Sequence, residues 1–112
     1  ITFYYNNGQI ESTYDLIDGV KCGDITVYYA NGKVKEKGSF NQGAKSGEWV
    51  SYDESGKLSS VAFYKNNVKD GTWKVWDEHG VLRSEIHYKK GQRSGLWKSF
   101  DENGQLIESK QY

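Results

Sequence analysis

The sequence has no proline, no methionine and a single cysteine. One cysteine, Cys22, excludes an intramolecular disulfide framework and any zinc site built from cysteines. No apolar run approaches the roughly 20 residues that a membrane-spanning helix needs. An excess of one charge is also lacking, because 15 basic residues balance 15 acidic ones. This balance argues against a nucleic-acid binder and against a polybasic membrane anchor.

Branched aliphatic residues are few for a globular core, and aromatic residues compensate at 15%, with four Trp and nine Tyr. The length of 112 residues predicts one domain, residues 1–112. Because the chain does not begin with Met, we expect a processed chain or a fragment of a longer one.

Glycines punctuate the chain with a period of 24 residues. Three series carry this period: Gly8, Gly32, Gly56, Gly80 and Gly104; Gly23, Gly47, Gly71 and Gly95; and Gly19, Gly43, Asn67 and Gly91. In the third, Asn replaces one glycine, because Asn also tolerates positive φ. Aromatic and aliphatic residues recur in the same register. Among these columns are Tyr28, Tyr52, Trp76 and Phe100; Ile25, Trp49, Trp73 and Trp97; Val34, Leu58, Leu82 and Leu106; and Leu16, Phe40, Tyr64, Tyr88 and Tyr112. The chain is therefore about four and a half copies of one unit.

Each unit is predicted to be a β-hairpin. Segments such as 73–76 and 82–88 are too short for helices, rich in aromatic and branched residues, and bounded by turn signals. A three-residue loop closed by Gly56 as a G1 bulge would place Tyr52 opposite Leu58, whereas a two-residue loop would pair polar with apolar residues. We therefore predict an all-β fold: a single-layer, twisted antiparallel meander of stacked hairpins. Ten strands would give a sheet about 45 Å long and about 23 Å wide.

Plain alternation along the strands predicts which side chains share a face. It places Tyr52 and Leu58 together with Ala62 and Tyr64, and it points Trp49 to the other face. Alternatively, the glycine two residues before each Trp kinks the strand and re-aims the indole. The pattern leaves both readings open.

These motifs resemble the MORN repeat, and more closely its bacterial variant, in which Tyr-x-x-Asn-Gly-x-Leu alternates with Gly-x-x-x-Gly-x-Trp. The matching segments are Tyr28–Val34, Lys69–Trp76 and Phe100–Leu106. The resemblance covers essentially the whole chain, although Cys22–Ile25 replaces the Gly-x-Trp signature in the first unit. It implies a curved sheet of stacked hairpins with a role in scaffolding or binding.

Bacterial members of this variant are often labelled YwqK-type antitoxins, so the resemblance also implies a toxin protein as partner. Eukaryotic MORN arrays are linked to membranes and phosphoinositides. For a bacterial chain the compartment stays open between the cytoplasm and the cell envelope, because the start of the chain is uninformative.

No catalytic residue, cofactor motif or metal site is predicted. His79, His87 and Cys22 have ordinary polar or aromatic residues as their equivalents in the other units, so nothing marks them as reactive. The Asp-Glu pairs at 53–54, 77–78 and 101–102 are explained by an Asp that caps the backbone of its own turn, without calcium. We therefore expect a protein that is not an enzyme and needs no cofactor.

The aromatic columns are the best candidates for binding, because Trp and Tyr are enriched in binding hot spots. The candidate residues are Trp49, Trp73, Trp97, Tyr52, Trp76 and Phe100. The competing interpretation is that these columns only form the core.

We predict that a partner protein or peptide is engaged across an aromatic face or at an edge strand, in an antitoxin-like or scaffold role. The open edges would also let copies of the chain pair with one another. The alternative function is a membrane-surface module in which clustered Lys and Arg bind anionic lipid headgroups.

Overall fold

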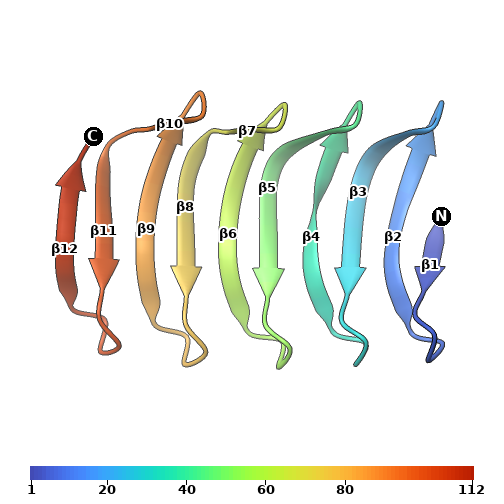
Figure 1. The fold of residues 1–112 in the computed structure, drawn as a ribbon, viewed down its shortest axis with the longest axis horizontal. Helices are drawn as coiled ribbons and strands as arrows, with labels where there is room; N and C mark the ends of the chain where they lie inside the picture. The colour runs from blue at the N-terminus through green and yellow to red at the C-terminus, as the bar shows by residue number, and fades with distance from the viewer.

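The computed structural model describes residues 1–112 and contains strands and no helix. The strands form one antiparallel sheet in meander order, and they bend near the upper edge in Figure 1. Their bounds are β1 Thr2–Tyr4, β2 Ile10–Ile17, β3 Val20–Tyr28, β4 Val34–Asn41, β5 Ala44–Tyr52, β6 Leu58–Lys65, β7 Val68–Lys69, β8 Gly71–Trp76, β9 Leu82–Lys89, β10 Gln92–Arg93, β11 Leu96–Phe100 and β12 Leu106–Gln111. The predicted all-β, single-layer meander is confirmed.

The sheet measures 43 × 31 × 14 Å. Its length agrees with the expected value, and it is wider than expected because β3 and β5 run to nine residues. Two of the ten predicted strands are interrupted and are therefore divided into β7 with β8 and β10 with β11. Both short pieces, β7 and β10, pair only with the preceding strand.

The turns at the lower edge follow the predicted geometry. The Gly56 N–H donates to the Asp53 carbonyl at 3.0 Å, and the Asp53 N–H donates to the Lys57 carbonyl at 2.8 Å. Gly56 has a φ of +93°, as the G1 bulge requires, and Tyr52 pairs with Leu58. The Asp53 carboxylate also accepts the N–H groups of Ser55 and Lys57, so this Asp caps its own turn. The turn prediction is confirmed.

The turns at the upper edge contain two residues, both with positive φ, which is the type I′ hairpin geometry. They are Asp18–Gly19, Gln42–Gly43, Asn66–Asn67 and Lys90–Gly91. Each of the last three turns also hydrogen-bonds to the preceding hairpin; the Asn67 N–H, for example, donates to the Lys45 carbonyl at 3.0 Å. Neighbouring hairpins are therefore held together at this edge as well as along the strands.

A second irregularity follows each lower turn. Ser51 pairs with Ser60 while Tyr52 pairs with Leu58, so Ser59 has no partner across the strands. A single extra residue moves the following side chains to the other side of the sheet. Ala62 therefore pairs with Trp49. The prediction that Ala62 and Tyr64 share a face with Tyr52 is wrong, because plain alternation ignores this bulge.

The sheet has almost no enclosed core. Only Ile25, Trp49, Val50 and Ser12 are buried. The accessible surface is 7284 Å², against about 6,300 Å² for a compact monomer of this mass. A single layer leaves two broad faces in contact with solvent, and these are the surfaces on which function must be sought.

Candidate binding face

The Trp residues are positioned by a kink in the strand that carries them. Gly47 has a φ of +77°. Between the pairs Lys37–Val50 and Ser39–Ser46, three residues of β5 stand opposite one residue of β4. The equivalent glycines also have positive φ: Gly23, Gly71 and Gly95. The kink proposed from the sequence therefore exists, and Trp49 still points away from the face of Tyr52.

Two of the indoles donate hydrogen bonds to carbonyl groups of the preceding strand. The Trp73 Nε1–H donates to the Phe63 carbonyl at 3.1 Å, and the Trp97 Nε1–H donates to the His87 carbonyl at 2.9 Å. These bonds hold the indole against the preceding strand.

The Trp column and the Tyr64 column interdigitate on one side of the sheet, which we call the ladder face. The rings follow one another across the hairpins with centroid separations of 5.0 to 6.5 Å, in the order Phe40, Trp49, Tyr64, Trp73, Tyr88, Trp97 and Tyr112. All of these pairs are tilted or edge-on, and edge-on contact is an arrangement that aromatic quadrupoles favour. The result is an unbroken row of rings from β4 to the C-terminus.

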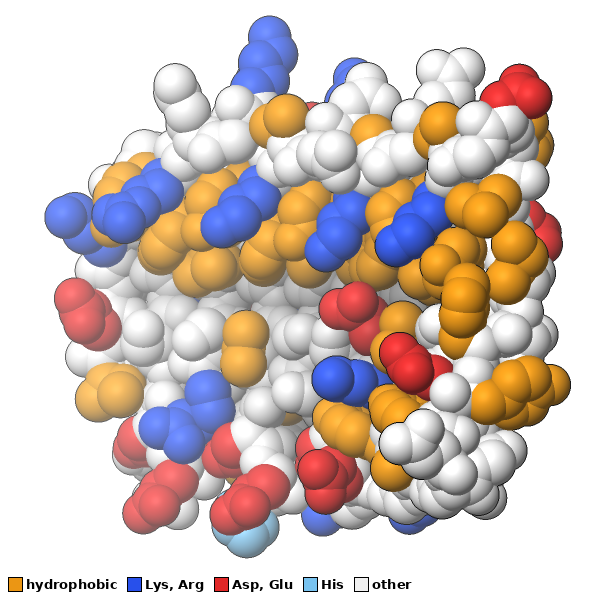
Figure 2. All heavy atoms as spheres, turned by 45° about the vertical axis from the view of Figure 1, so that its right-hand side comes forward, with side chains coloured by type: hydrophobic (Ala, Val, Ile, Leu, Met, Phe, Trp, Pro, Cys, Tyr) orange, Lys and Arg blue, Asp and Glu red, His pale blue; other side chains and the backbone are white.

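A row of cations lies over the rings. Each member contacts two rings, at 4.6 to 5.4 Å from the ring centroids, and the members recur every 24 residues as Lys21, Lys45, Lys69 and Arg93. We call these four residues the cation row. Figure 2 shows Lys and Arg side chains over a band of hydrophobic side chains that crosses the molecule. Lys21 lies over Tyr14 and Phe40, so the row continues into the first unit although Ile25 replaces Trp there.

Trp49 differs from the other two ladder indoles. It is 4% exposed, and its buried N–H has no hydrogen-bond partner. Its ring lies directly on Gly38, where a Cβ atom would overlap the indole. The equivalent positions carry Ala62 and Ile86, so only this unit has room for the indole to lie so close to the backbone.

The ladder environment changes the ionisation of one ring. Burial raises the pKa of the Tyr64 hydroxyl above its ordinary value, because the phenolate is poorly solvated, and the Glu36 carboxylate adds repulsion. Tyr64 is therefore held in its neutral form.

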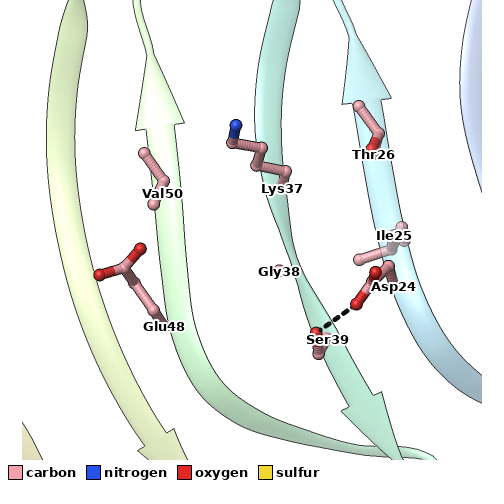
Figure 3. Close-up of a pocket in the computed structure, with 8 residues that line it drawn as sticks. All are labelled: Asp24, Ile25, Thr26, Lys37, Gly38, Ser39, Glu48 and Val50. Carbon is pink, nitrogen blue, oxygen red and sulfur yellow. Dashed lines mark hydrogen bonds between the residues drawn. The ribbon is translucent and has the colours of Figure 1, made fainter.

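The other predicted binding residues, Tyr52, Trp76 and Phe100, lie on the opposite face. The Lys37 ammonium is 5.7 Å from the Tyr52 ring centroid. A shallow hollow on this face is lined by both apolar and charged residues, and the Ser39 hydroxyl donates to the Asp24 carboxylate there at 2.7 Å (Figure 3). The six candidates therefore do not form one site: three belong to each face.

Sequence reasoning missed the cation row and the part that Tyr64, Tyr88 and Tyr112 take in the ladder. The 24-residue recurrence of the basic residues is visible in the sequence, and it could have pointed to a common role. The rings beneath these basic residues could not be recognised, because the unpaired residue Ser59 decides the face on which Tyr64 lies.

The side chains that could hold a metal ion lie apart from one another. No three His, Cys, Asp or Glu side chains gather closely enough to hold a metal ion. His87 contacts the Thr72 hydroxyl at 2.9 Å and the Glu85 carboxylate at 3.7 Å, both on the surface of the sheet. No helix is long and apolar enough to cross a bilayer.

Comparison with protein families supports the repeat. The family described as the MORN repeat variant matches four times, at residues 21–42, 45–66, 69–90 and 93–112. No curated protein matches the chain. Each match begins at a member of the cation row and includes one lower turn, so the family unit coincides with the structural one.

Proposed function

Since this chain belongs to the MORN repeat variant family, whose repeats are generally non-enzymatic binding and scaffold modules, we propose that it binds a partner protein or peptide across the ladder face. The observation that carries the proposal is the unbroken row of rings beneath the cation row, all of them partly exposed except Trp49. Trp, Tyr and Arg are the residues that dominate binding hot spots, and all three occur on this face.

The shape of the face supports a partner that crosses several hairpins. Trp73, Tyr88 and Trp97 are only half-buried, and they lie on successive strands. A partner lying along the rings would contact the same chemistry in each hairpin. Weak contacts that repeat in this way add within one interface and give useful affinity without a deep pocket.

The finer role we propose is antitoxin-like or scaffold-like. In the first case the partner is a toxin protein, and the ladder face masks part of its surface. In the second case the partner is a member of an assembly. Both roles require only that a partner cover the ladder face. The bacterial origin implied by the resemblance, and binding at an edge strand as a second mode, remain part of the proposal.

Site-specific photo-crosslinking in cells tests the proposal. A benzoylphenylalanine at Tyr88 samples the ladder face, and the same group at Trp76 samples the opposite face as a matched control, since both positions are half-buried aromatics. We expect a protein adduct from position 88 and none from position 76. Adducts from position 76 alone would refute the choice of face, and the absence of adducts from both would refute a protein partner.

The cation row also supports the alternative function, binding to anionic lipid headgroups at a membrane surface. Co-sedimentation with vesicles containing phosphatidylserine separates the two. Pelleting at low salt that is lost at high salt, together with no protein adduct at position 88, would favour the lipid function over our proposal.

A further inference from the structure

The charges of this neutral chain are sorted across the width of the sheet. Besides the cation row, the upper edge carries three further basic residues, Lys65, Lys89 and Lys90, and its acidic exception is Asp18 in the first upper turn. The last three lower turns carry six acidic residues: Asp53, Glu54, Asp77, Glu78, Asp101 and Glu102. Two lysines, Lys33 and Lys57, also lie in lower turns. In Figure 2 most Asp and Glu side chains lie below the band of hydrophobic side chains, with some Lys and Arg side chains among them and some acidic side chains at the upper right. The net charge of zero therefore conceals a mainly basic upper edge and, in the last three hairpins, a mainly acidic lower edge.

The cation row has no carboxylate to neutralise it. The four ion pairs of the structure involve the N-terminus, His79, Arg83 and His87, and none involves a member of the row. Lys21, Lys69 and Arg93 are exposed, and Lys45 is half-buried. Glu36 lies on the same face, but it accepts a hydrogen bond from the Ser51 hydroxyl and lies beyond ion-pair distance of the row.

The spacing of the row defines what can neutralise it. Successive members are two strands apart, which is about 10 Å at about 4.8 Å per strand. The row follows the long axis of the sheet, which is 43 Å long. A complementary ligand therefore has several negative charges along an elongated body, with apolar groups beside them to contact the rings.

We infer that the ladder face recognises an acidic segment of the partner, one whose carboxylates meet Lys21, Lys45, Lys69 and Arg93 and whose apolar side chains pack on the rings. The inference rests on the proposed function and adds the chemistry of the partner to it. The sorted charges also orient the segment: it follows the basic edge and avoids the acidic turns. Steering by these charges would make association fast and sensitive to salt.

The test uses a 15-residue peptide of five Glu-Glu-Leu units, which spans about 50 Å when extended and so covers the row. Its affinity for the full chain is measured by fluorescence anisotropy at low and high salt. A peptide of five Lys-Lys-Leu units is the charge-reversed control. We expect binding of the acidic peptide only, weakened at least tenfold by high salt.

Two triple variants with the same change in net charge identify the face. Lys45→Gln, Lys69→Gln and Arg93→Gln remove three members of the row, whereas Lys37→Gln, Lys74→Gln and Lys98→Gln remove three cations from the opposite face. We expect at least a tenfold loss of peptide affinity in the first and less than a twofold loss in the second. The single variant Lys69→Gln tests the same row if the triple variant does not fold. We expect it to weaken binding about threefold.

Equal losses in the two triple variants would overturn the inference, because binding would then depend only on net charge. Binding to phosphatidylserine vesicles without binding to the peptide would overturn it in favour of a lipid surface. A protein adduct at position 88 together with no affinity for the peptide would refute the acidic segment and leave the proposed function standing.

Discussion

The two faces of the sheet are built from the same strands, but residue types at positions 24 residues apart vary more on one face than on the other. On the ladder face each hairpin presents a basic residue, and from the second hairpin on it presents a Trp and an aromatic partner in the same places. On the opposite face one position changes from Val50 to Lys74 and another from Phe63 to His87. Ring contacts on the ladder face cross from one hairpin to the next. In a sheet without an enclosed core, side chains that join neighbouring hairpins supply much of the stability. On the ladder face these side chains recur from the second hairpin on, whereas on the opposite face the Tyr52 and Leu58 columns recur and the positions between them vary.

The first prediction from this comparison is that a Trp→Ala truncation lowers the free energy of unfolding more on the ladder face than on the opposite face. Trp73→Ala removes contacts with two rings, the bond to the Phe63 carbonyl and the contact with Lys69. We expect a loss of about 3 kcal/mol in the free energy of unfolding. Trp76→Ala, on the opposite face, should cost about half as much. Urea unfolding measures both, and an equal or larger loss at Trp76 would contradict the account.

The second prediction concerns the unusual indole of the ladder face. Gly38→Ala would place a Cβ atom inside the ring of Trp49, so the indole must move. We expect a loss of about 1–3 kcal/mol from overpacking and a shift of Trp fluorescence to longer wavelength. Ala62→Gly is the converse change beneath Trp73 and should cost about 1 kcal/mol or less. Unchanged stability and fluorescence in Gly38→Ala would show that the indole does not lie on the backbone.

The third prediction isolates the cations. Lys69→Met keeps most of the aliphatic stem and removes the charge that lies over Trp73 and Tyr88. We expect a loss of about 0.5–1 kcal/mol. Lys65→Met, near the adjacent turn and without a ring contact, should leave thermal stability unchanged within error. A neutral effect of Lys69→Met would mean that the cation row contributes to binding only.

The fourth and smallest effect is a pH dependence at the lower edge. Hydrogen bonds from the Val81 and His79 N–H groups, with a contribution from Arg83, hold the pKa of Asp77 below its ordinary value. The carboxylate therefore stabilises the fold above about pH 4, and this contribution is lost as the pH falls through the lowered pKa. Asp77→Asn should make the free energy of unfolding depend less on pH in the acidic range. Glu78→Gln, in the same turn, should not, and identical profiles for the two variants would contradict the role of the Asp cap.

Much of the fold could be predicted because the repeat makes each signal recur. The turn at Gly56 followed from the 24-residue period, the need for positive φ and the apolar pair that a three-residue loop creates. Asn67 follows the same rule: it stands where the other upper turns have Gly, and its φ is +68°. Local rules are enough where a backbone conformation excludes most residue types.

The ladder face could not be predicted by the same rules. The bulge at Ser59 carries no glycine and no other residue that demands it, yet it decides whether Tyr64 lies beside Trp49 or beside Tyr52. The bulge depends on pairing with the neighbouring strand, which alternation along one strand does not report. Residues assigned to a binding column from the sequence therefore divided between two faces.

The indole N–H signals of the four Trp residues offer the most direct test of the central claim, because three of them lie on the ladder face and one on the opposite face. In a ¹H–¹⁵N spectrum titrated with the acidic peptide, we expect the Nε1 signals of Trp73 and Trp97 to shift, while that of Trp76 stays in place. A shift confined to Trp76 would mean that the peptide binds the opposite face and would contradict the account.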